Sequence, residues 1–312
     1  MAKTVVALLM GGHSTERAVS LASGQNVMAQ LDPALYKVMV FDPAVDLIRL
    51  IEEAPSLNVV FPVLHGADGE NGSIQGFLGL LGLPYVGSGV LASATCIDKK
   101  ATKDVYRSQG LPVAPDCLLS REKPLSENLL TLEKAVGYPA VVKPLDQGSS
   151  VGLTIVKTAD LAPRALSLAF ETASLALGEK FLPGRELTVG VIGNDRLRAL
   201  PPLEIIPAAG HDFFDYEAKY TQGQAREVVP SDFTPAETSK IQELALTAHR
   251  ALGCRGLSRT DFIYSDGVFY LLETNTMPGL TENSLLPKAA LAAGLSFPAL
   301  LTTLIDLALG LE

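Results

Sequence analysis

The sequence is poor in cysteine and has no paired cysteine motif. Three cysteines occur in 312 residues, and none belongs to a CxxC pair. This pattern predicts neither a zinc site nor a disulfide framework, and it fits a reducing compartment. We interpret Cys96, Cys117 and Cys254 as buried, small apolar side chains.

An excess of positive charge is also missing. The formal net charge is −9, which disfavours a general attraction to nucleic acid or to anionic membranes. A polyanionic ligand would therefore need a local cluster of cations.

Apolar stretches long enough to span a membrane, about 20 residues, are absent as well. The apolar segment Ala289–Ile305 is shorter and contains Pro298. The stretch Val5–Met10 is not followed by the cleavage pattern of a signal peptide. We therefore expect a cytoplasmic protein without membrane insertion.

What is present is typical of a globular protein, with 47% hydrophobic and 19% charged residues. A chain of 312 residues favours two or three domains over a single core. Near the N-terminus we predict strands over Val5–Met10 and Asn58–Leu64, a helix that starts near Ser14 as N-cap, and a helix over Ile74–Leu81. This alternation predicts a small α/β domain whose loops gather at one sheet edge.

The middle of the chain predicts an α+β unit. Asp98 is a candidate N-cap for a helix that runs to Gln109. Residues 111–119 contain two prolines and form an edge strand at most. Further strands and helices are expected over Ala140–Lys143, Leu153–Lys157, Leu129–Val136 and Leu161–Phe170.

The last part predicts antiparallel strands followed by helices. Asp266-Gly267 is a strong turn signal for a hairpin of Leu257–Tyr264 and Val268–Glu273. Residues 210–232 carry four aromatic side chains without a helical period, and so long a loop is usually functional, often a lid. Two more strands and an amphipathic helix are expected over Glu186–Ile192, Arg198–Ile206 and Thr234–Leu252.

Three oxygen-bearing side chains are predicted to meet at this hairpin. Asp261 lies in its first strand, and Glu273 and Asn275, two residues apart on one face, end its second. Such ligands suit magnesium bound together with phosphates. Solvated acidic residues at strand ends explain the spacing equally well. The turn that follows, residues 276–279, offers backbone amides to a developing anion.

A glycine loop predicts an anion site. Successive amides of Gly148–Gly152 form a nest, and Lys143 adds a positive charge, although an ordinary hairpin loop is the alternative. The chain has no GxxxxGK[ST] motif, and its one GxGxxA string, residues 87–92, lacks the acidic partner of a dinucleotide site. Glu179 and Glu186 flank a Pro-Gly hinge, a common place for nucleotides.

Seven groups of residues carry a family resemblance over nearly the whole chain. They are Gly11–Arg17 with Val19–Leu21 and Ser23-Gly24, Leu64–Gly66 with Gly69–Gly72 and Gln75-Gly76, Lys143-Pro144, Gly148–Gly152, Asp215–Tyr220, Arg259–Phe262 and Glu273–Thr281. One such group is weakly specific, but seven in the same order are strongly so. Together they resemble the ATP-grasp superfamily and, within it, the D-alanine–D-alanine ligase family.

The resemblance implies an α/β and α+β fold with a three-domain ATP-grasp architecture. The implied domains are residues 1–95, an N-terminal parallel-sheet domain that binds substrate, residues 96–183, the central domain, and residues 184–312, the C-terminal domain with a magnesium site and a lid at about 209–232. It also implies that the carboxylate of one D-alanine attacks the γ-phosphate of ATP. The amine of a second D-alanine then displaces phosphate through a tetrahedral intermediate, giving a dipeptide for peptidoglycan precursors.

The resemblance assigns roles to matching residues. The implied ligands of two magnesium ions, with manganese as a substitute, are Asp261, Glu273 and Asn275. The implied ATP contacts are Lys99, Lys143 and Lys219 for phosphates, Ser149 and Ser150 in the loop, Glu179, Phe181 and Leu182 for adenine, and Glu186 for ribose. The implied contacts of the first D-alanine are Glu16, in a hydrogen-bonded set with Ser150 and Tyr216, and His65. The implied oxyanion donors are Arg259 and the Gly279 amide, and the second D-alanine would meet Ser284 and Leu285.

Alternatives stay open beside these roles. Without the resemblance, a core histidine is the favoured interpretation of His65. Glu16 is alternatively a favourable charge at a helix start, and Tyr216 a packing aromatic. The family usually has Asp where Asn71 stands, and the lid exit at residues 226–231 is atypical, which leaves lid closure and nucleotide affinity open.

The competing functions are a D-alanine–D-lactate or other dipeptide ligase and a nucleotide-binding protein without turnover. The last would lack a metal ligand or a phosphate cation, and none is missing. The resemblance further implies a homodimer, and activation by a monovalent cation such as K+ is an open expectation.

Overall fold

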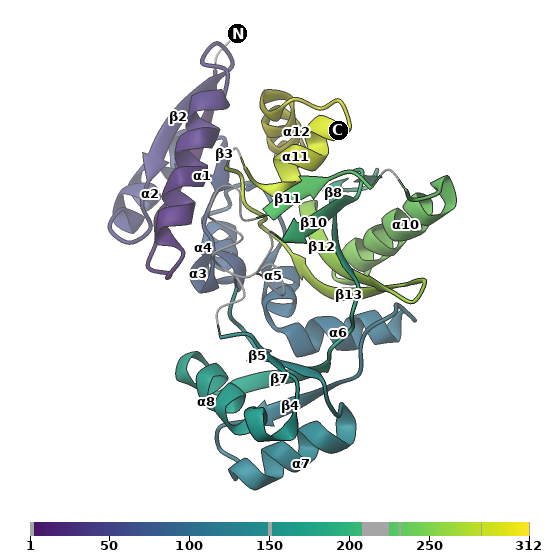
Figure 1. The fold of residues 1–312 in the computed structure, drawn as a ribbon. Coiled ribbons are helices and arrows are strands. Elements are labelled where there is room, and N and C mark those ends of the chain that lie inside the picture. Colours follow the sequence, from purple (N-terminus) through teal and green to yellow (C-terminus); the bar gives the residue numbers. More distant parts are fainter. Residues whose placement is uncertain (1–2, 149–151, 208–224, 231, 282, 312) are drawn as a thin grey trace.

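The computed structural model describes residues 3–148, 152–207, 225–230, 232–281 and 283–311. Three units follow one another along the chain, and each contains a β-sheet (Figure 1). The N-terminal unit lies at the upper left of Figure 1, the C-terminal unit at the upper right, and the central unit below them.

The N-terminal unit is a parallel sheet with helices around it. The strand order is β2-β1-β3, with β1 at Thr4–Leu9, β2 at Tyr36–Phe41 and β3 at Val59–Pro62. Its helices are α1 (Arg17–Gln30), α2 (Leu47–Glu53), the 3-10 turn η1 (Ala54–Ser56), α3 (Ala67–Glu70), α4 (Ser73–Leu80) and α5 (Val90–Ile97). All four residues of β3 are buried, as expected for a parallel sheet covered on both faces. The predicted parallel α/β domain is confirmed.

One predicted helix start is wrong. α1 begins at Arg17, and Glu16 rather than Ser14 occupies the N-cap position. Gly11 and Gly12 have φ values of 98° and 79°, in the left-handed region that glycine tolerates, so the turn extends further before the helix begins. The Ser14 hydroxyl instead donates to the His65 carbonyl over 2.5 Å. This bond ties the loop after β1 to the loop after β3.

The central unit is an antiparallel sheet of order β4-β7-β5-β6. Its elements are α6 (Lys99–Ser108), β4 (Asp116–Ser120), α7 (Leu125–Ala135), β5 (Ala140–Pro144), β6 (Thr154–Val156), η2 (Ala159–Leu161), α8 (Ala162–Thr172) and β7 (Leu175–Lys180). The prediction of an edge strand is confirmed in β4. Asp98 caps α6 as predicted, because its side chain accepts from the amides of Lys100 and Ala101.

The C-terminal unit is a six-stranded antiparallel sheet of order β11-β10-β8-β12-β13, with β9 paired to β8. Its strands are β8 (Arg185–Gly193), β9 (Arg198–Ala199), β10 (Leu203–Pro207), β11 (Ala225–Val228), β12 (Gly256–Ser265) and β13 (Val268–Asn275). The predicted single strand Arg198–Ile206 is wrong. It divides into β9 and β10, because Pro201 and Pro202 in its middle have no N–H group to donate.

The predicted hairpin of β12 and β13 is confirmed. Asp266 and Gly267 both have positive φ values, 48° and 80°, as a tight hairpin turn requires. Three helices complete the unit: α10 (Pro235–Ala251), α11 (Leu285–Ala292) and α12 (Phe297–Leu309).

One hydrophobic cluster joins the N-terminal and C-terminal units. Leu8 of β1 and Phe61 of β3 are fully buried in the same cluster as Leu286 of α11 and Leu304 of α12. A second cluster joins α5 and α6 to β8, β12 and α10. The central sheet has a cluster of its own between α7 and α8. The N-terminal and C-terminal units therefore share a hydrophobic core, while the central sheet has a separate one.

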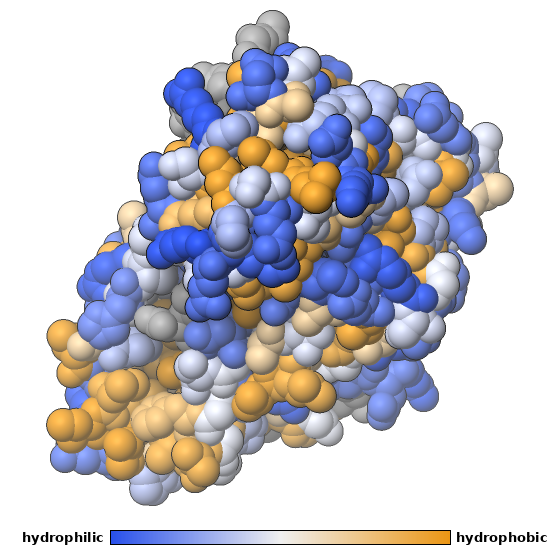
Figure 2. All heavy atoms as spheres, turned by 90° about the horizontal axis from the view of Figure 1, so that it is seen from below, coloured by the Kyte–Doolittle hydropathy of each residue, from blue (hydrophilic) through white to orange (hydrophobic). Residues whose placement is uncertain are grey.

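The surface has a mixed character. Seen from below, toward the central unit, apolar residues stand among hydrophilic ones (Figure 2). Exposed apolar side chains of that unit are Leu118, Leu125, Leu130, Leu161 and Leu168. In the described ranges no single helix is long and apolar enough to cross a membrane, and only α11 and α12 together reach that length, with a bend of 103° between them.

Candidate active site

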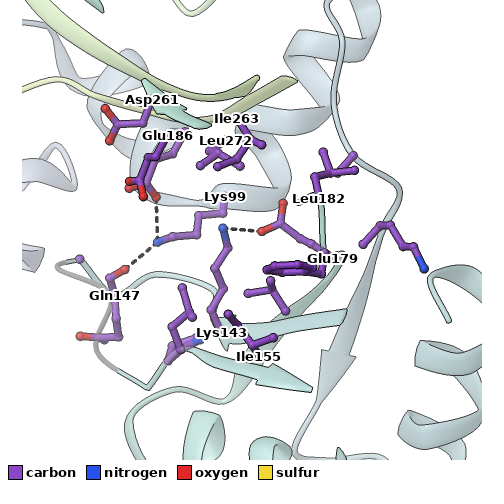
Figure 3. Close-up of a pocket in the computed structure, with 18 residues that line it drawn as sticks. Lys99, Lys143, Gln147, Ile155, Glu179, Leu182, Glu186, Asp261, Ile263 and Leu272 are labelled. Carbon is purple, nitrogen blue, oxygen red and sulfur yellow. Dashed lines mark hydrogen bonds and ion pairs between the residues drawn. The ribbon is translucent and has the colours of Figure 1, made fainter. Parts of the chain in front are cut away.

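The first pocket lies between the central and C-terminal sheets (Figure 3). Its charged end gathers the side chains of Lys99, Lys143, Glu186 and Asp261, with Glu273 next to Lys99. Toward the other end lie the apolar side chains of Ile155, Leu182, Ile263 and Leu272, and Val141 and Phe181 also line the pocket. A pocket that is apolar at one end and highly charged at the other suits a ligand with a flat base and an anionic tail.

Glu179 is buried between two lysines. The Nζ of Lys103 lies 2.5 Å from Glu179 Oε1, and the Nζ of Lys143 contacts Oε2. Burial acts to raise the pKa of Glu179, but the two lysines outweigh it and hold the pKa at about 2. Burial likewise lowers the pKa of Lys103, whereas for Lys143 the attraction of Glu179 and Glu273 outweighs burial and raises the pKa.

Lys99 joins the glycine loop to the hairpin. Its Nζ donates to the backbone carbonyl of Gln147 over 2.6 Å and lies 3.7 Å from Glu273 Oε2. Lys99 is the first residue of α6, directly after the Asp98 cap. The cap therefore fixes where this buried cation enters the pocket.

The register of the hairpin brings the predicted metal ligands together. Asp261 lies opposite Glu273, Arg259 lies opposite Asn275, and a bulge follows Asp261. Thr188 Oγ1 donates to Asp261 Oδ1 over 2.6 Å, and Asn275 Nδ2 lies 3.3 Å from Asp261 Oδ2. In the described part of the chain, no cluster of three His, Cys, Asp or Glu is poised for a metal. The available donors are two carboxylates and an amide, an oxygen set that fits magnesium completed by phosphates and water.

Arg259 also engages this carboxylate. Its Nε and Nη2 lie 2.9 and 2.8 Å from the two oxygens of Asp261, a bidentate geometry that only arginine provides. Arg259 therefore links the predicted metal ligand Asp261 to the neighbouring pocket, which Arg259 also lines.

A second pocket adjoins the first. It is lined by Glu16, Val19, His65, Glu70, Gly148, Glu227, Arg259, Glu273, Asn275, Met277, Pro278, Gly279, Asn283, Ser284 and Leu285. Gly148 and Glu273 line both pockets. A group bound in one pocket thus meets a group bound in the other at these two residues.

The N-terminal wall of the second pocket holds three titratable groups. Burial lowers the pKa of His65 against the opposing charge of Glu16, so the imidazole is neutral near pH 7. Its Nε2 lies 3.1 Å from the hydroxyl of Ser23. Burial and the charge of Glu16 raise the pKa of Glu70 to about 8, while the Gly66 amide donates to Glu70 Oε2 over 2.8 Å. One of two neighbouring acids is thereby kept protonated.

The opposite wall is a compact turn before α11. Ser284 Oγ accepts from the Thr281 amide over 3.0 Å and contacts Thr281 Oγ1 over 2.8 Å. A Cβ atom at position 279 would lie 2.8 Å from Ser284 Oγ. A side chain at position 279 would therefore have to displace the Ser284 hydroxyl.

The structure gathers the predicted residues into two sets. The first pocket contains Lys99, Lys143, Glu179, Phe181, Leu182, Glu186, Asp261 and Glu273. The second contains Glu16, His65, Arg259, Asn275, Gly279, Ser284 and Leu285, with Glu273 shared. The remaining predicted residues, Ser149, Ser150, Tyr216 and Lys219, lie outside the described residues.

Sequence reasoning assigned no role to three residues at the site. Lys103 contacts Glu179, Glu70 lines the second pocket, and Glu227 lines it while its Oε2 lies 2.9 Å from Lys288 Nζ. The spacing of Lys103 four residues after Lys99 was a usable signal, because such residues share a helix face. Glu227 follows the undescribed segment, and no local pattern marks it.

Family models and curated relatives match this chain over nearly its whole length. Two family models match, "D-ala D-ala ligase C-terminus" over residues 105–306 and "D-ala D-ala ligase N-terminus" over residues 45–88. A D-alanine–D-alanine ligase of Syntrophobacter fumaroxidans is 49% identical over 98% of both chains. One of Desulfotalea psychrophila is 47% identical over 97% of this chain and 94% of its own.

Solved structures agree with these relatives. The crystal structure of a D-alanine–D-alanine ligase from Bacillus anthracis complexed with ATP has a TM-score of 0.85 at 33% identity, covering 99% of this chain and 98% of that one. The VanG D-Ala:D-Ser ligase of Enterococcus faecalis has a TM-score of 0.85 at 30% identity, covering 98% and 100%.

Proposed function

The chain belongs to the D-alanine–D-alanine ligase family, and from this premise we propose how its own residues carry out the reaction. It is an ATP-dependent ligase that condenses two D-alanines to D-alanyl-D-alanine, with ADP and phosphate as the other products. The observation that carries this function is the contact of the two pockets at Gly148 and Glu273. Activation of a carboxylate by ATP requires the γ-phosphate and the carboxylate to meet at such a junction.

We propose that adenine occupies the apolar end of the first pocket. The backbone at Phe181 and Leu182 and the carboxylate of Glu179 receive the base, and Glu186 receives the ribose hydroxyls. Support comes from the chemistry of this end, which offers apolar walls together with an ionised carboxylate. A carboxylate accepts hydrogen bonds only, which matches the amino group of adenine.

The phosphates lie at the charged end in this proposal. Lys99 and Lys143 supply positive charge to the α- and β-phosphates, since both line the pocket next to the glycine loop. Lys219 and Ser149 keep the phosphate roles that the family resemblance implies.

Magnesium is proposed at Asp261, Glu273 and Asn275, whose oxygen donors fit it. Two such ions, when bound, would supply positive charge to the phosphates, a role that manganese would also fill. Arg259 would then release the carboxylate of Asp261 and turn toward the second pocket. We also propose that a monovalent cation such as K+ activates the enzyme.

The two amino acids occupy the second pocket. Glu16 receives the ammonium group of the first D-alanine, with Ser150 and Tyr216 in its hydrogen-bonded set, and neutral His65 lies near that substrate's carboxylate. Ser284 binds the carboxylate of the second D-alanine, and Leu285 limits the size of its side chain.

The reaction proceeds in two steps at the junction. The carboxylate oxygen of the first D-alanine attacks the γ-phosphorus, and ADP leaves, which gives an acyl phosphate. The amine of the second D-alanine attacks the acyl carbon, and the guanidinium of Arg259 and the Gly279 amide stabilise the oxyanion of the tetrahedral intermediate. Phosphate then leaves, and the amide bond remains.

We also propose the assembly and location of the enzyme. The domain limits are residues 1–95, 96–183 and 184–312, as the order of the three sheets supports. The chain forms a homodimer in this proposal. The cytoplasm, where ATP and peptidoglycan precursors are available, suits three cysteines that are all free thiols.

The assignment is tested with purified protein, ATP, magnesium and D-alanine. We expect release of one ADP and one phosphate for each dipeptide formed. A coupled assay measures the ADP, and mass spectrometry measures the dipeptide. L-alanine is the matched control and should yield no dipeptide. Absence of turnover with D-alanine would overturn the function. A product with D-serine or D-lactate at the second position in preference to D-alanine would instead assign the second subsite to that substrate.

A further inference from the structure

Lys103 is a buried cation that the reaction outlined above does not use. Its side chain is 0% exposed, and its Nζ pairs with Glu179 Oε1 and lies 3.5 Å from the Leu271 carbonyl of β13. It follows Lys99 by one helical turn of α6, so both lysines leave the same face of the helix. Lys99 lines the nucleotide pocket, whereas Lys103 does not. Lys103 therefore reaches Glu179 from behind the pocket wall.

Glu179 thus has two cationic partners that differ in access. Lys143 lines the pocket and Lys103 is shut off from it. Phosphates entering the pocket compete for Lys143, because they carry more negative charge than the carboxylate. A buried carboxylate left without a counter-ion is strongly disfavoured. Lys103 supplies the charge that stays with Glu179 when Lys143 turns to the nucleotide.

We propose that Lys103 is a positioning residue that keeps Glu179 ionised and aimed at the adenine amino group, and thereby sets the preference of the site for adenine over guanine. The inference rests on the proposed function, since it takes the first pocket as the nucleotide site. Adenine presents an amino donor at the position where guanine presents a carbonyl oxygen. An ionised Glu179 accepts from the former and repels the latter, whereas a protonated Glu179 would donate to guanine.

The test is Lys103→Met, which removes the charge and keeps an unbranched side chain of similar length. With one cation lost, the pKa of Glu179 should rise. The KM of the variant for ATP should then increase about tenfold or more. This KM should increase further as the pH falls from 8 to 6, whereas the KM of the wild type should stay constant over this range. The ratio of kcat/KM for ATP over GTP should fall, while kcat at saturating ATP and the KM for D-alanine change little. Isothermal titration with each nucleotide reads the same effect without turnover.

Matched variants separate positioning from loss of fold. Lys100→Met removes a lysine of the same helix whose side chain is 29% exposed and pairs with Asp104 and with Asp116, which Arg107 also holds. Its KM for ATP and its pH profile should match those of the wild type. The double variant Lys103→Met/Glu179→Gln lacks both the buried carboxylate and the buried lysine that neutralises it. Because Glu179→Gln alone leaves the buried Lys103 without its counter-ion, the double variant should unfold at the same temperature as Glu179→Gln or at a higher one, and the two variants should bind ATP with similar affinity.

Two outcomes would overturn the inference. One is a folded Lys103→Met protein with an unchanged pH profile and an unchanged preference for ATP over GTP. The other, decisive where the single variant does not fold, is a double variant far weaker in ATP binding than Glu179→Gln, because Lys103 would then act independently of Glu179. Failure of the proposed function is distinct, since it would show in the wild type as no ADP release with D-alanine.

Discussion

At the scale of single residues, the second pocket separates two acidic side chains by protonation. Glu70 has a pKa of about 8 next to Glu16, so its proton is retained through neutral pH. The carboxyl keeps its hydrogen bond from the Gly66 amide without adding a second negative charge beside Glu16. The site therefore meets the first amino acid with a neutral carboxyl at Glu70.

The substitution Glu70→Gln should remove the pH dependence of stability that this proton causes. The ordinary pKa of the group is 4.5 and its folded value is about 8, so the folded state binds more protons than the unfolded state between these limits. Stability from the wild-type group is then present at low pH and is lost as the pH rises toward 8, at up to about 1.4 kcal/mol per pH unit. Glutamine does not titrate and can still accept the Gly66 bond.

Thermal unfolding from pH 5 to pH 8.5 tests this. We expect the Tm of Glu70→Gln relative to the wild type to increase steadily with pH. Glu171→Gln, at an exposed position of α8, is the control and should give a constant difference. A Tm difference for Glu70→Gln that does not change with pH would show that Glu70 has an ordinary pKa.

The residues of the site were predictable in unequal measure. Asp261, Glu273 and Asn275 follow from two-residue periodicity and the turn signal at Asp266-Gly267, both of which are local. Spacing alone left them undecided between ligands and solvated acids, and the family resemblance was needed to decide. Lys103 was not predicted, because its partner lies 76 residues away on β7, and no local pattern reports the pairing of α6 with that strand.

At the scale of elements, α6 positions Lys99, which lines the nucleotide pocket, and Lys103, which lies behind the pocket wall. Its start is fixed by Asp98, which accepts from two backbone amides. Two of its lysines, Lys99 and Lys103, are buried at the site. A change at the cap therefore affects both stability and nucleotide affinity.

Asp98→Ala should destabilise the protein by about 1 kcal/mol, as loss of an N-cap does, and should also raise the KM for ATP. Thr234→Ala is the matched control, because Thr234 caps α10 through a capping box with Glu237. We expect a similar loss of stability there without a change in KM. Urea unfolding and initial rates at varied ATP measure the two effects. An equal KM in both variants would mean that the cap of α6 does not position Lys99.

The elements themselves were predictable where the signal is local. The Asp98 cap, the β12–β13 turn and the α10 helix follow from residues within one or two turns of the chain. The start of α1 was misplaced, because the hydroxyl of Ser14 bonds to His65, 51 residues away, instead of capping the helix. The sequence reasoning did not identify β7, whose place between β4 and β5 depends on long-range pairing.

At the scale of the whole molecule, the nucleotide pocket bridges the central and C-terminal units. A ligand that binds only the folded chain stabilises it, by about 2.7 kcal/mol at a hundred times its Kd. ATP with magnesium should therefore raise the Tm in a concentration-dependent way. Glu273→Gln should lose the magnesium-dependent part of this rise, together with most of the turnover, because an amide is a weaker ligand than a carboxylate.

Scanning calorimetry with ATP, in magnesium or in EDTA, measures this rise. Because Glu273 also pairs with the buried Lys99 over 3.7 Å, the Tm of Glu273→Gln without nucleotide is expected to fall somewhat, and each shift is taken relative to the same protein without nucleotide. An equal magnesium-dependent shift in both proteins would contradict the metal site at Glu273.

The hydrophobic cluster that joins β1 and β3 to α11 and α12 also limits how relatives can exchange parts. A chimera that replaced only residues 1–95 would combine core side chains of two parents in one cluster, and mismatched volumes in a packed core are destabilising. The central sheet closes its own cluster with α7 and α8, so its strands and these two helices can be exchanged as a cassette, whereas α6 packs against the C-terminal unit. Recombination between homologous genes should therefore be tolerated best when the two ends of the coding sequence come from the same parent.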